Sequence, residues 1–183
     1  GLTPDATERR ITALVALGDI ASQAGDLDGA NQRYERAIAA TADPDARSII
    51  ENKRHRPEVA TRDGAKIVYY LHGSGEPTLL FVNPIVYGLA IFQPVLERLC
   101  QDFRIVTIDC RGTGGSDALS RPYSITEHVK DVAAVIERLG DGPVIGVGVS
   151  RGGILLAKVI AKQPGLITKM VTIGTPLGPT AGY

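Results

Sequence analysis

The spacing of apolar residues changes character once along the chain. Residues 1 to about 43 are rich in alanine and carry apolar side chains at the three- and four-residue intervals of a helix. Two helical stretches are marked in this way, by Ile11, Leu14, Val15, Leu17 and Ile20 and then by Leu27, Ala30, Tyr34, Ala37 and Ile38. Gly25 is placed to end the first helix and Asp26 to cap the second, and Asp43-Pro44-Asp45 stops the second. This region therefore predicts a tight helical hairpin.

From Glu58 onward, short β-rich runs alternate with longer helical ones. We expect strands at 58–61, 66–71, 78–82, 104–108, 143–149 and 169–173, and helices at 89–100, 125–139 and 152–163. Asp63-Gly64 is a hairpin turn signal and residues 73–77 form the next turn, so the region opens antiparallel. Strands that alternate with helices require right-handed crossovers and a largely parallel sheet covered on both faces.

The predicted fold class is therefore α/β, with an antiparallel start, then a parallel sheet with flanking helices, and an N-terminal α-helical hairpin. We divide the chain into the hairpin (1–47), a linker (48–57) and the α/β region (58–183). The linker is assigned because residues 48–57 are polar and basic, and His55 within it is expected to be solvated.

A chemically suggestive turn follows the apolar run 144–149. Ser150 stands at the end of that run, flanked by Gly148 and Gly152, and a helix is expected directly afterwards. A strand–turn–helix corner this sharp strains the serine backbone and needs glycine two residues to either side. It would hold the Ser150 hydroxyl at the carboxyl edge of the sheet, with the Arg151 N–H aimed at a negative charge developing on an attacked carbonyl oxygen. The alternative is a helix-capping serine in a glycine-rich turn.

A second motif precedes it by one crossover, where the strand 104–108 leads into Asp109-Cys110-Arg111-Gly112-Thr113-Gly114-Gly115-Ser116. Together with the serine turn, this motif resembles the α/β-hydrolase fold superfamily over about residues 58–178. The resemblance implies a serine hydrolase acting on an ester, thioester, lactone or amide, with Ser150 as nucleophile and the Arg151 N–H in the oxyanion hole. Asp109 and Arg111 are expected to fix the glycine-rich loop rather than to react.

The same resemblance places the second oxyanion donor after the strand 78–82, where the family commonly shows a His-Gly pair. Here the sequence is Asn83-Pro84-Ile85-Val86, and proline has no N–H to donate. The donor is therefore expected to be the N–H of Ile85, with Val86 as the alternative.

The family's catalytic acid and histidine follow the serine in the chain, and the resemblance places both on later loops. Residues 174–183 contain no His, Asp or Glu. His55, His72 and His128 are expected at the surface and not against Ser150. We therefore expect the acid and histidine outside this chain, and a partner at the exposed sheet edge, either the remainder of the hydrolase domain or a self-associating copy. The alternative function is a non-catalytic binding or regulatory module.

The N-terminal hairpin resembles a tetratricopeptide repeat. The residues that carry this resemblance are Leu17-Gly18, Ala21, Gly25, Ala30, Tyr34, Ala37 and Pro44. A single repeat cannot bury its own apolar face, so it is expected to stack on further repeats, the adjacent domain or another chain. A plain helical hairpin packed on its neighbour remains open.

Composition narrows the function classes. Twenty basic residues balance twenty acidic ones, which disfavours nucleic acid and anionic membranes as partners. Cys100 and Cys110 lie in or beside apolar runs and are expected to be small buried side chains. Because so few cysteines suggest no disulfide framework, we expect the protein in a reducing compartment, the cytoplasm. We expect no secretory leader, no membrane span, no metal and no cofactor; the expected ligand is a small-molecule acyl substrate.

Overall fold

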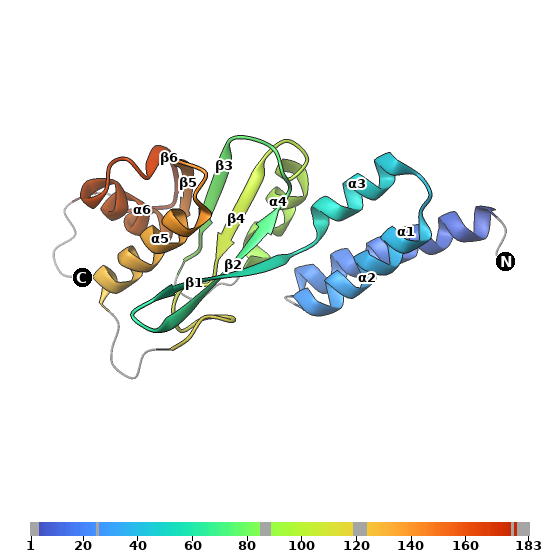
Figure 1. Ribbon diagram of the computed structural model, residues 1–183, viewed down its shortest axis with the longest axis horizontal. Helices are drawn as coiled ribbons and strands as arrows, with labels where there is room; N and C mark the ends of the chain where they lie inside the picture. The colour runs from blue at the N-terminus through green and yellow to red at the C-terminus, as the bar shows by residue number, and fades with distance from the viewer. Residues whose placement is uncertain (1–3, 25, 85–88, 119–123, 177, 179–183) are drawn as a thin grey trace.

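The computed structural model describes residues 4–24, 26–84, 89–118, 124–176 and 178 (Figure 1). Its helices are α1 (Pro4–Gln23), α2 (Leu27–Ala40), α3 (Pro44–Lys53), α4 (Gln93–Leu99, preceded by the 3₁₀ turn Leu89–Phe92), α5 (Ile125–Leu139) and α6 (Arg151–Lys162). Its strands are β1 (Arg56–Arg62), β2 (Ala65–His72), β3 (Thr78–Val82), β4 (Arg104–Ile108), β5 (Val144–Val149) and β6 (Ile167–Ile173). The described strands form one sheet in the order β1-β2-β4-β3-β5-β6.

The sheet is mixed, as the sequence predicts. β1 and β2 form an antiparallel hairpin at Asp63-Gly64, where both residues take positive φ (52° and 79°). β2 runs antiparallel to β4, and β4, β3, β5 and β6 are mutually parallel. The predicted fold class, a partial α/β core with N-terminal helices, is confirmed.

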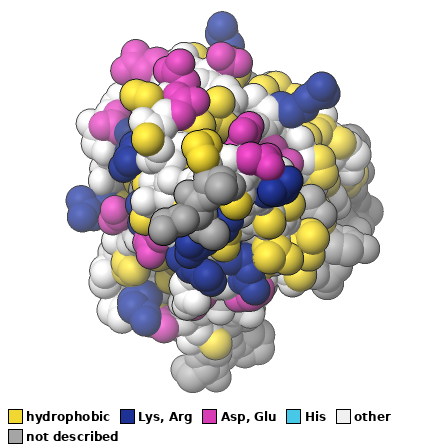
Figure 2. Space-filling model, turned by 90° about the vertical axis from the view of Figure 1, so that its right-hand side faces the viewer, with side chains coloured by type: hydrophobic (Ala, Val, Ile, Leu, Met, Phe, Trp, Pro, Cys, Tyr) yellow, Lys and Arg dark blue, Asp and Glu magenta, His cyan; other side chains and the backbone are white. Residues whose placement is uncertain are grey.

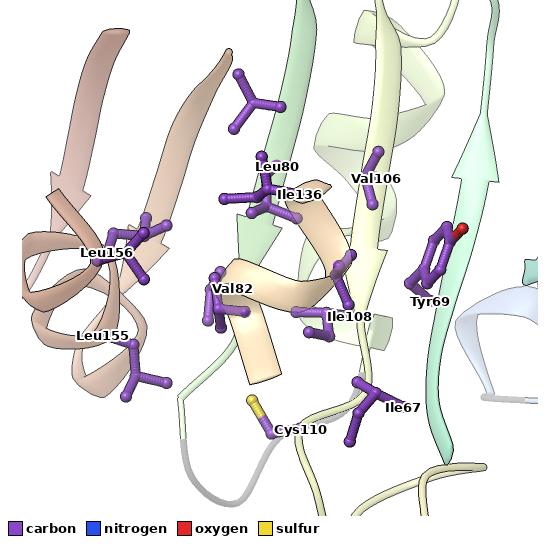
Figure 3. Close-up of a cluster of buried hydrophobic side chains, with 14 of the residues drawn as sticks. Ile67, Tyr69, Leu80, Val82, Val106, Ile108, Cys110, Ile136, Leu155 and Leu156 are labelled. Atoms are coloured by element: carbon purple, nitrogen blue, oxygen red, sulfur yellow. The ribbon is translucent and has the colours of Figure 1, made fainter. Parts of the chain in front are cut away.

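Helices cover the sheet on both faces because the central strands are apolar on both. Leu80 and Val82 of β3 face a core completed by α5 and α6, whereas Leu79 and Phe81 face a second core completed by α4. Figure 3 shows the first of these cores, with Ile136 of α5 and the α6 side chains facing the sheet. The two layers leave the carboxyl ends of β3, β4, β5 and β6 at one common edge.

The N-terminal helices α1–α3 lie at the right of Figure 1, at the far end of the molecule from α6 and β6. α1 and α2 pack through Leu14, Ala21, Ala30, Tyr34 and Ala37, all buried. The Asp26 carboxylate accepts a hydrogen bond from the Gly29 N–H and caps α2 as expected, while Gly25 lies outside the described residues. Leu17 and Ile20 have the same helical spacing as the buried residues of α1 but are 50% and 62% exposed.

Residues 48–57 do not form the connection that the sequence predicts. α3 begins at Pro44, is capped by Asp43, and continues to Lys53, and β1 starts at Arg56. Polar residues misled the prediction because one side of α3 is solvent-exposed while Ile50 is buried against α1 and α2. A proline at the first helical position starts a helix as readily as it ends one.

His55 lies where α3 gives way to β1 and joins the helices to the sheet. Its backbone N–H donates to the Asn31 amide oxygen (2.8 Å), and its carbonyl accepts from the Asn31 amide nitrogen (2.6 Å). Its ring contacts the ring of His72 edge-on, with centroids 4.9 Å apart. His72 in turn lies 3.1 Å from the Thr107 hydroxyl of β4.

Two further expectations concern the cysteines and the membrane. Cys100 and Cys110 are both free and buried, as predicted. Within the described ranges, no helix is long and apolar enough to cross a membrane.

Candidate active site

The corner between β5 and α6 holds Ser150, one of two non-glycine residues with positive φ among the described residues. Ser150 takes φ 51° and ψ −117°, a conformation that L-residues rarely adopt. It occupies the capping position of α6, yet its side chain makes no capping hydrogen bond there. A serine serving as an ordinary helix cap would have extended backbone and such a bond, so the capping interpretation fails.

Close backbone contacts explain the glycines on both sides of this serine. A Cβ on Gly148 would collide with the Gly153 nitrogen, and a Cβ on Gly152 would collide with the Val82 carbonyl oxygen at the end of β3. Both obstacles are backbone atoms, which cannot rotate away. The helix α6 therefore approaches the sheet as closely as it does only because these positions lack side chains.

Hydrogen bonds from β6 and the residues after it hold the corner. The Ser150 N–H donates to the Ile173 carbonyl (2.8 Å), and the Thr175 hydroxyl donates to the Ser150 carbonyl (3.1 Å). Thr175 also fills the space beside Gly153. Sequence reasoning missed Thr175; the available signal is its place just beyond β6, the parallel neighbour of β5.

The glycine-rich loop after β4 is anchored by Asp109, as expected. The Asp109 carboxylate accepts hydrogen bonds from the Gly115 N–H (2.9 Å) and the Tyr70 hydroxyl (3.2 Å), and Gly114 has no room for a Cβ beside it. Burial raises the pKa of Asp109, and the two hydrogen bonds oppose that rise. Ser116 ties the same loop to β2 by accepting from the Val68 N–H (2.7 Å).

Arg111 also fixes the glycine-rich loop, as expected, through a partner on α5. Its guanidinium donates two hydrogen bonds to the buried Asp131 carboxylate (2.8 and 2.6 Å), which also accepts one from Arg62 of β1 (2.6 Å). Asp131 thus fastens the loop and the β-hairpin to one helix. Sequence reasoning missed Asp131; the available signal is an acidic residue directly before the buried Val132 of α5.

Arg151 begins α6, so its backbone N–H is among those without a partner inside the helix. Its positive charge shifts the pKa values of two buried side chains, His128 and Cys110. The pKa of His128 is lowered to about 4, mainly by burial and secondly by Arg151. The pKa of Cys110 is raised to about 11 by burial, and Arg151 opposes that rise. The other expected oxyanion donor, Ile85, lies outside the described residues.

All three histidines are buried, which corrects the expectation that they lie at the surface. His72 pairs with Ile105 at the start of β4, so His72 and its neighbour His55 lie at the sheet edge opposite the one that Ser150 occupies. Burial lowers the pKa of His55 to about 4. His128 lies on the inner side of α5, the side facing the sheet. The expectation that His55 and His72 lie away from Ser150 agrees with this geometry.

Comparison with known proteins agrees with the fold. The family model described as alpha/beta hydrolase fold matches residues 66–182. The 2-(acetamidomethylene)succinate hydrolase of Mesorhizobium japonicum is 36% identical over 55% of this chain and 36% of its own length. The putative carbamate hydrolase RutD of Azorhizobium caulinodans is 28% identical over 60% of this chain and 41% of its own length.

A solved structure also shares this fold. The crystal structure of a hydrolase from Pseudomonas aeruginosa PA01 superimposes with a TM-score of 0.62 at 31% identity, over 67% of this chain and 48% of that one. The chain therefore spans less than half the length of each of these three relatives.

Proposed function

Because this chain belongs to the α/β-hydrolase fold family, we propose that it carries the nucleophile of a serine hydrolase and that Ser150 is this nucleophile. The observation that carries the proposal is the φ of 51° at Ser150 between two glycines that admit no side chain. Strain of this kind is tolerated where the surrounding structure enforces it and a function uses it. Here it keeps the hydroxyl out of a capping bond and at the carboxyl edge of the sheet.

The chemistry follows from this placement. The Ser150 oxygen attacks the acyl carbon of the substrate, and the carbonyl oxygen takes up the negative charge. The Arg151 N–H, at the positive end of the α6 dipole, donates to that oxygen, and Ile85 is the proposed second donor. The carbonyl then re-forms as the bond to the leaving alcohol, thiol or amine breaks, and that group takes up the proton that the base removed from Ser150. Water finally hydrolyses the acyl-serine, which releases the acid and restores the Ser150 hydroxyl. Thr175 acts on the Ser150 backbone and is a positioning residue.

An activated serine also needs a base and an acid that orients it. Since the chain spans less than half of its relatives' length, we propose that both groups come from the remainder of a hydrolase domain. β6 is the place for it to join, because β6 pairs on one side with β5 and leaves Val171 and Ile173 about half exposed. Self-association through the same strand is the competing arrangement.

The substrate class is proposed as an ester, thioester, lactone or amide. The relatives named as a succinate-derivative hydrolase and a carbamate hydrolase act on carbonyl compounds, which supports acyl transfer as the reaction class. The cytoplasm is the proposed location, supported by two buried cysteines that are not paired.

The test is turnover of p-nitrophenyl acetate, a thioester and a lactone by the longest product of the gene. Ser150→Ala is expected to lower kcat at least 1,000-fold. Ser74→Ala, which removes an exposed hydroxyl from the β2–β3 turn, is the matched control and is expected to leave turnover unchanged. Equal turnover in Ser150→Ala and the parent, or none in either, favours the alternative of a non-catalytic binding module.

A further inference from the structure

The Arg151 side chain follows directly on the proposed nucleophile and has no acidic partner. It is half-buried, and among the residues that the structure describes it makes no hydrogen bond and no ion pair. The other buried or half-buried arginines described in the α/β region each pair with a carboxylate, namely Arg62 with Asp131 and Glu127, Arg104 with Asp141, and Arg111 with Asp131. A charge held partly out of water without a counter-charge is unfavourable, so a ligand that supplies the counter-charge would bind well here.

The end of the molecule formed by α1–α3 provides a contrast. Figure 2 faces this end and shows Lys and Arg side chains lying among Asp and Glu side chains. Arg9 pairs there with Asp5. Arg10 and Arg36 pair with no residue in the described part of the chain, but both are exposed, so water solvates them. Arg151 has neither an acidic partner nor full access to water.

The carboxylates around Arg151 are already engaged by other donors. The charge of Arg151 acts on His128 and Cys110, which puts its guanidinium beside the first turn of α5 and the start of the loop after β4. Three carboxylates lie on these segments: Asp131 accepts from Arg62 and Arg111, Glu127 from Arg62 and Lys130, and Asp109 from the Gly115 N–H and the Tyr70 hydroxyl. The guanidinium of Arg151 therefore keeps its donors for a group from outside these segments.

The position of Arg151 in the chain relates that group to the reaction. Ser150 and Arg151 are consecutive, so their Cα atoms are about 3.8 Å apart, and both lie at the carboxyl edge of the sheet, where ligands bind in open α/β folds. An anion on the guanidinium and an acyl carbon at Ser150 can thus belong to one small molecule. A guanidinium pairs with carboxylates and with phosphates. One carboxylate matches the single charge of Arg151, whereas a phosphate monoester carries about −1.5 to −2.

We propose that the Arg151 guanidinium binds a carboxylate of the substrate, so that this protein acts on acyl compounds that carry a carboxylate close to the scissile bond. A half-ester or half-amide of a short dicarboxylic acid has this form. Arg151 then contacts the substrate twice, through its backbone N–H at the oxyanion and through its side chain at the carboxylate. This assignment rests on the proposed function, because it names the substrate class of the site that Ser150 defines.

The experiment measures kcat/KM of the longest product of the gene for three esters. Mono-p-nitrophenyl succinate carries a carboxylate on the acyl part, 4-acetoxybenzoate carries one on the leaving group, and p-nitrophenyl acetate is neutral. The kcat/KM of each anionic ester is divided by that of p-nitrophenyl acetate, because a disturbed oxyanion hole would slow all three. The ratios of the parent are compared with those of Arg151→Gln. The matched control is Lys158→Gln, which removes a positive charge from an exposed position of α6.

The ratio is expected to fall at least tenfold in Arg151→Gln for the ester whose carboxylate reaches the guanidinium, as the loss of one charge-assisted hydrogen bond implies. Arg151→Lys is expected to retain part of the ratio, because lysine keeps the charge without the planar fork. Lys158→Gln is expected to stay within twofold of the parent. Ratios that do not change in Arg151→Gln for either anionic ester, or that fall equally in Lys158→Gln, would overturn the carboxylate site.

A binding measurement separates this outcome from failure of the proposed function. If none of the three esters is hydrolysed, the proposed function fails, and calorimetric titration of Ser150→Ala with monomethyl succinate and dimethyl succinate decides the carboxylate site. Tighter binding of the monomethyl ester, lost when Arg151→Gln is added, would support the site. Equal binding of the two compounds, or no binding of either, would overturn it.

Discussion

Replacing Ser150 by glycine is expected to stabilise the protein relative to replacing it by alanine. Both changes remove the hydroxyl, but alanine keeps the Cβ that makes φ 51°, ψ −117° unfavourable, and glycine does not. Holding an L-residue in such a conformation costs about 1–3 kcal/mol. Glycine also gains freedom in the unfolded chain, which costs about 0.5–1 kcal/mol. Ser150→Gly should therefore be the more stable variant by about 1 kcal/mol.

Equilibrium unfolding in urea measures this difference, and at this chain length about 1 kcal/mol corresponds to about 2–4 °C in Tm. The control compares alanine with glycine at position 161, an exposed position of α6 with helical backbone. There Ala161→Gly is expected to lower the free energy of unfolding by about 1 kcal/mol. The opposite signs at the two positions are the signature of strain at Ser150. A Ser150→Gly variant that is no more stable than Ser150→Ala would refute the reasoning.

Three further changes test the surroundings of the site. Gly152→Ala should destabilise by about 1–3 kcal/mol in urea unfolding, because its Cβ meets the backbone of β3, whereas Gly165→Ala, in open space, should change little; similar losses at both would contradict the packing argument. Asp131→Asn should lower the free energy of unfolding by about 3–5 kcal/mol, because Arg62 and Arg111 lose a buried negative charge. The control Lys130→Gln, at an exposed position, should lower it by less than about 0.5 kcal/mol. The pKa of His55 is lowered to about 4 in the fold from an ordinary 6.5, so the unfolded chain binds the proton first. Its contribution to the free energy of unfolding, about 3 kcal/mol, is complete above pH 6.5 and is lost as the pH falls toward 4. Because His128 titrates over the same range, a pH series of unfolding free energies should become less steep in His55→Phe without becoming flat, and an unchanged slope would contradict this.

Local patterns predicted most of the α/β region because each of its elements is locally consistent. The period-2 and period-3.6 patterns place β3 and β4 at the ranges expected, and α5 begins and ends where the pattern does. The close contacts at Gly148 and Gly152 were anticipated because a strand that turns directly into a helix leaves no space for a Cβ.

The rest depended on contacts between residues far apart in the sequence. A polar run such as 48–57 does not reveal that one residue of a helix, Ile50, has a neighbour to bury it. Leu17 and Ile20 have the helical spacing of a core and are nevertheless exposed, because spacing does not specify which of two apolar sides is occupied. The burial of His55 and the pairing of Asp131 with Arg111 likewise follow from tertiary packing alone.

The central claim is that Ser150 is an activated nucleophile, and labelling with a fluorophosphonate probe tests it most directly. The probe is applied to this chain and to any longer product of the same gene, with Ser150→Ala in each and peptide mapping of the adduct. The account predicts an adduct on Ser150 in the protein that also contains the acid and histidine, and none in Ser150→Ala. An adduct on another residue, or no adduct in any of these proteins, would contradict it.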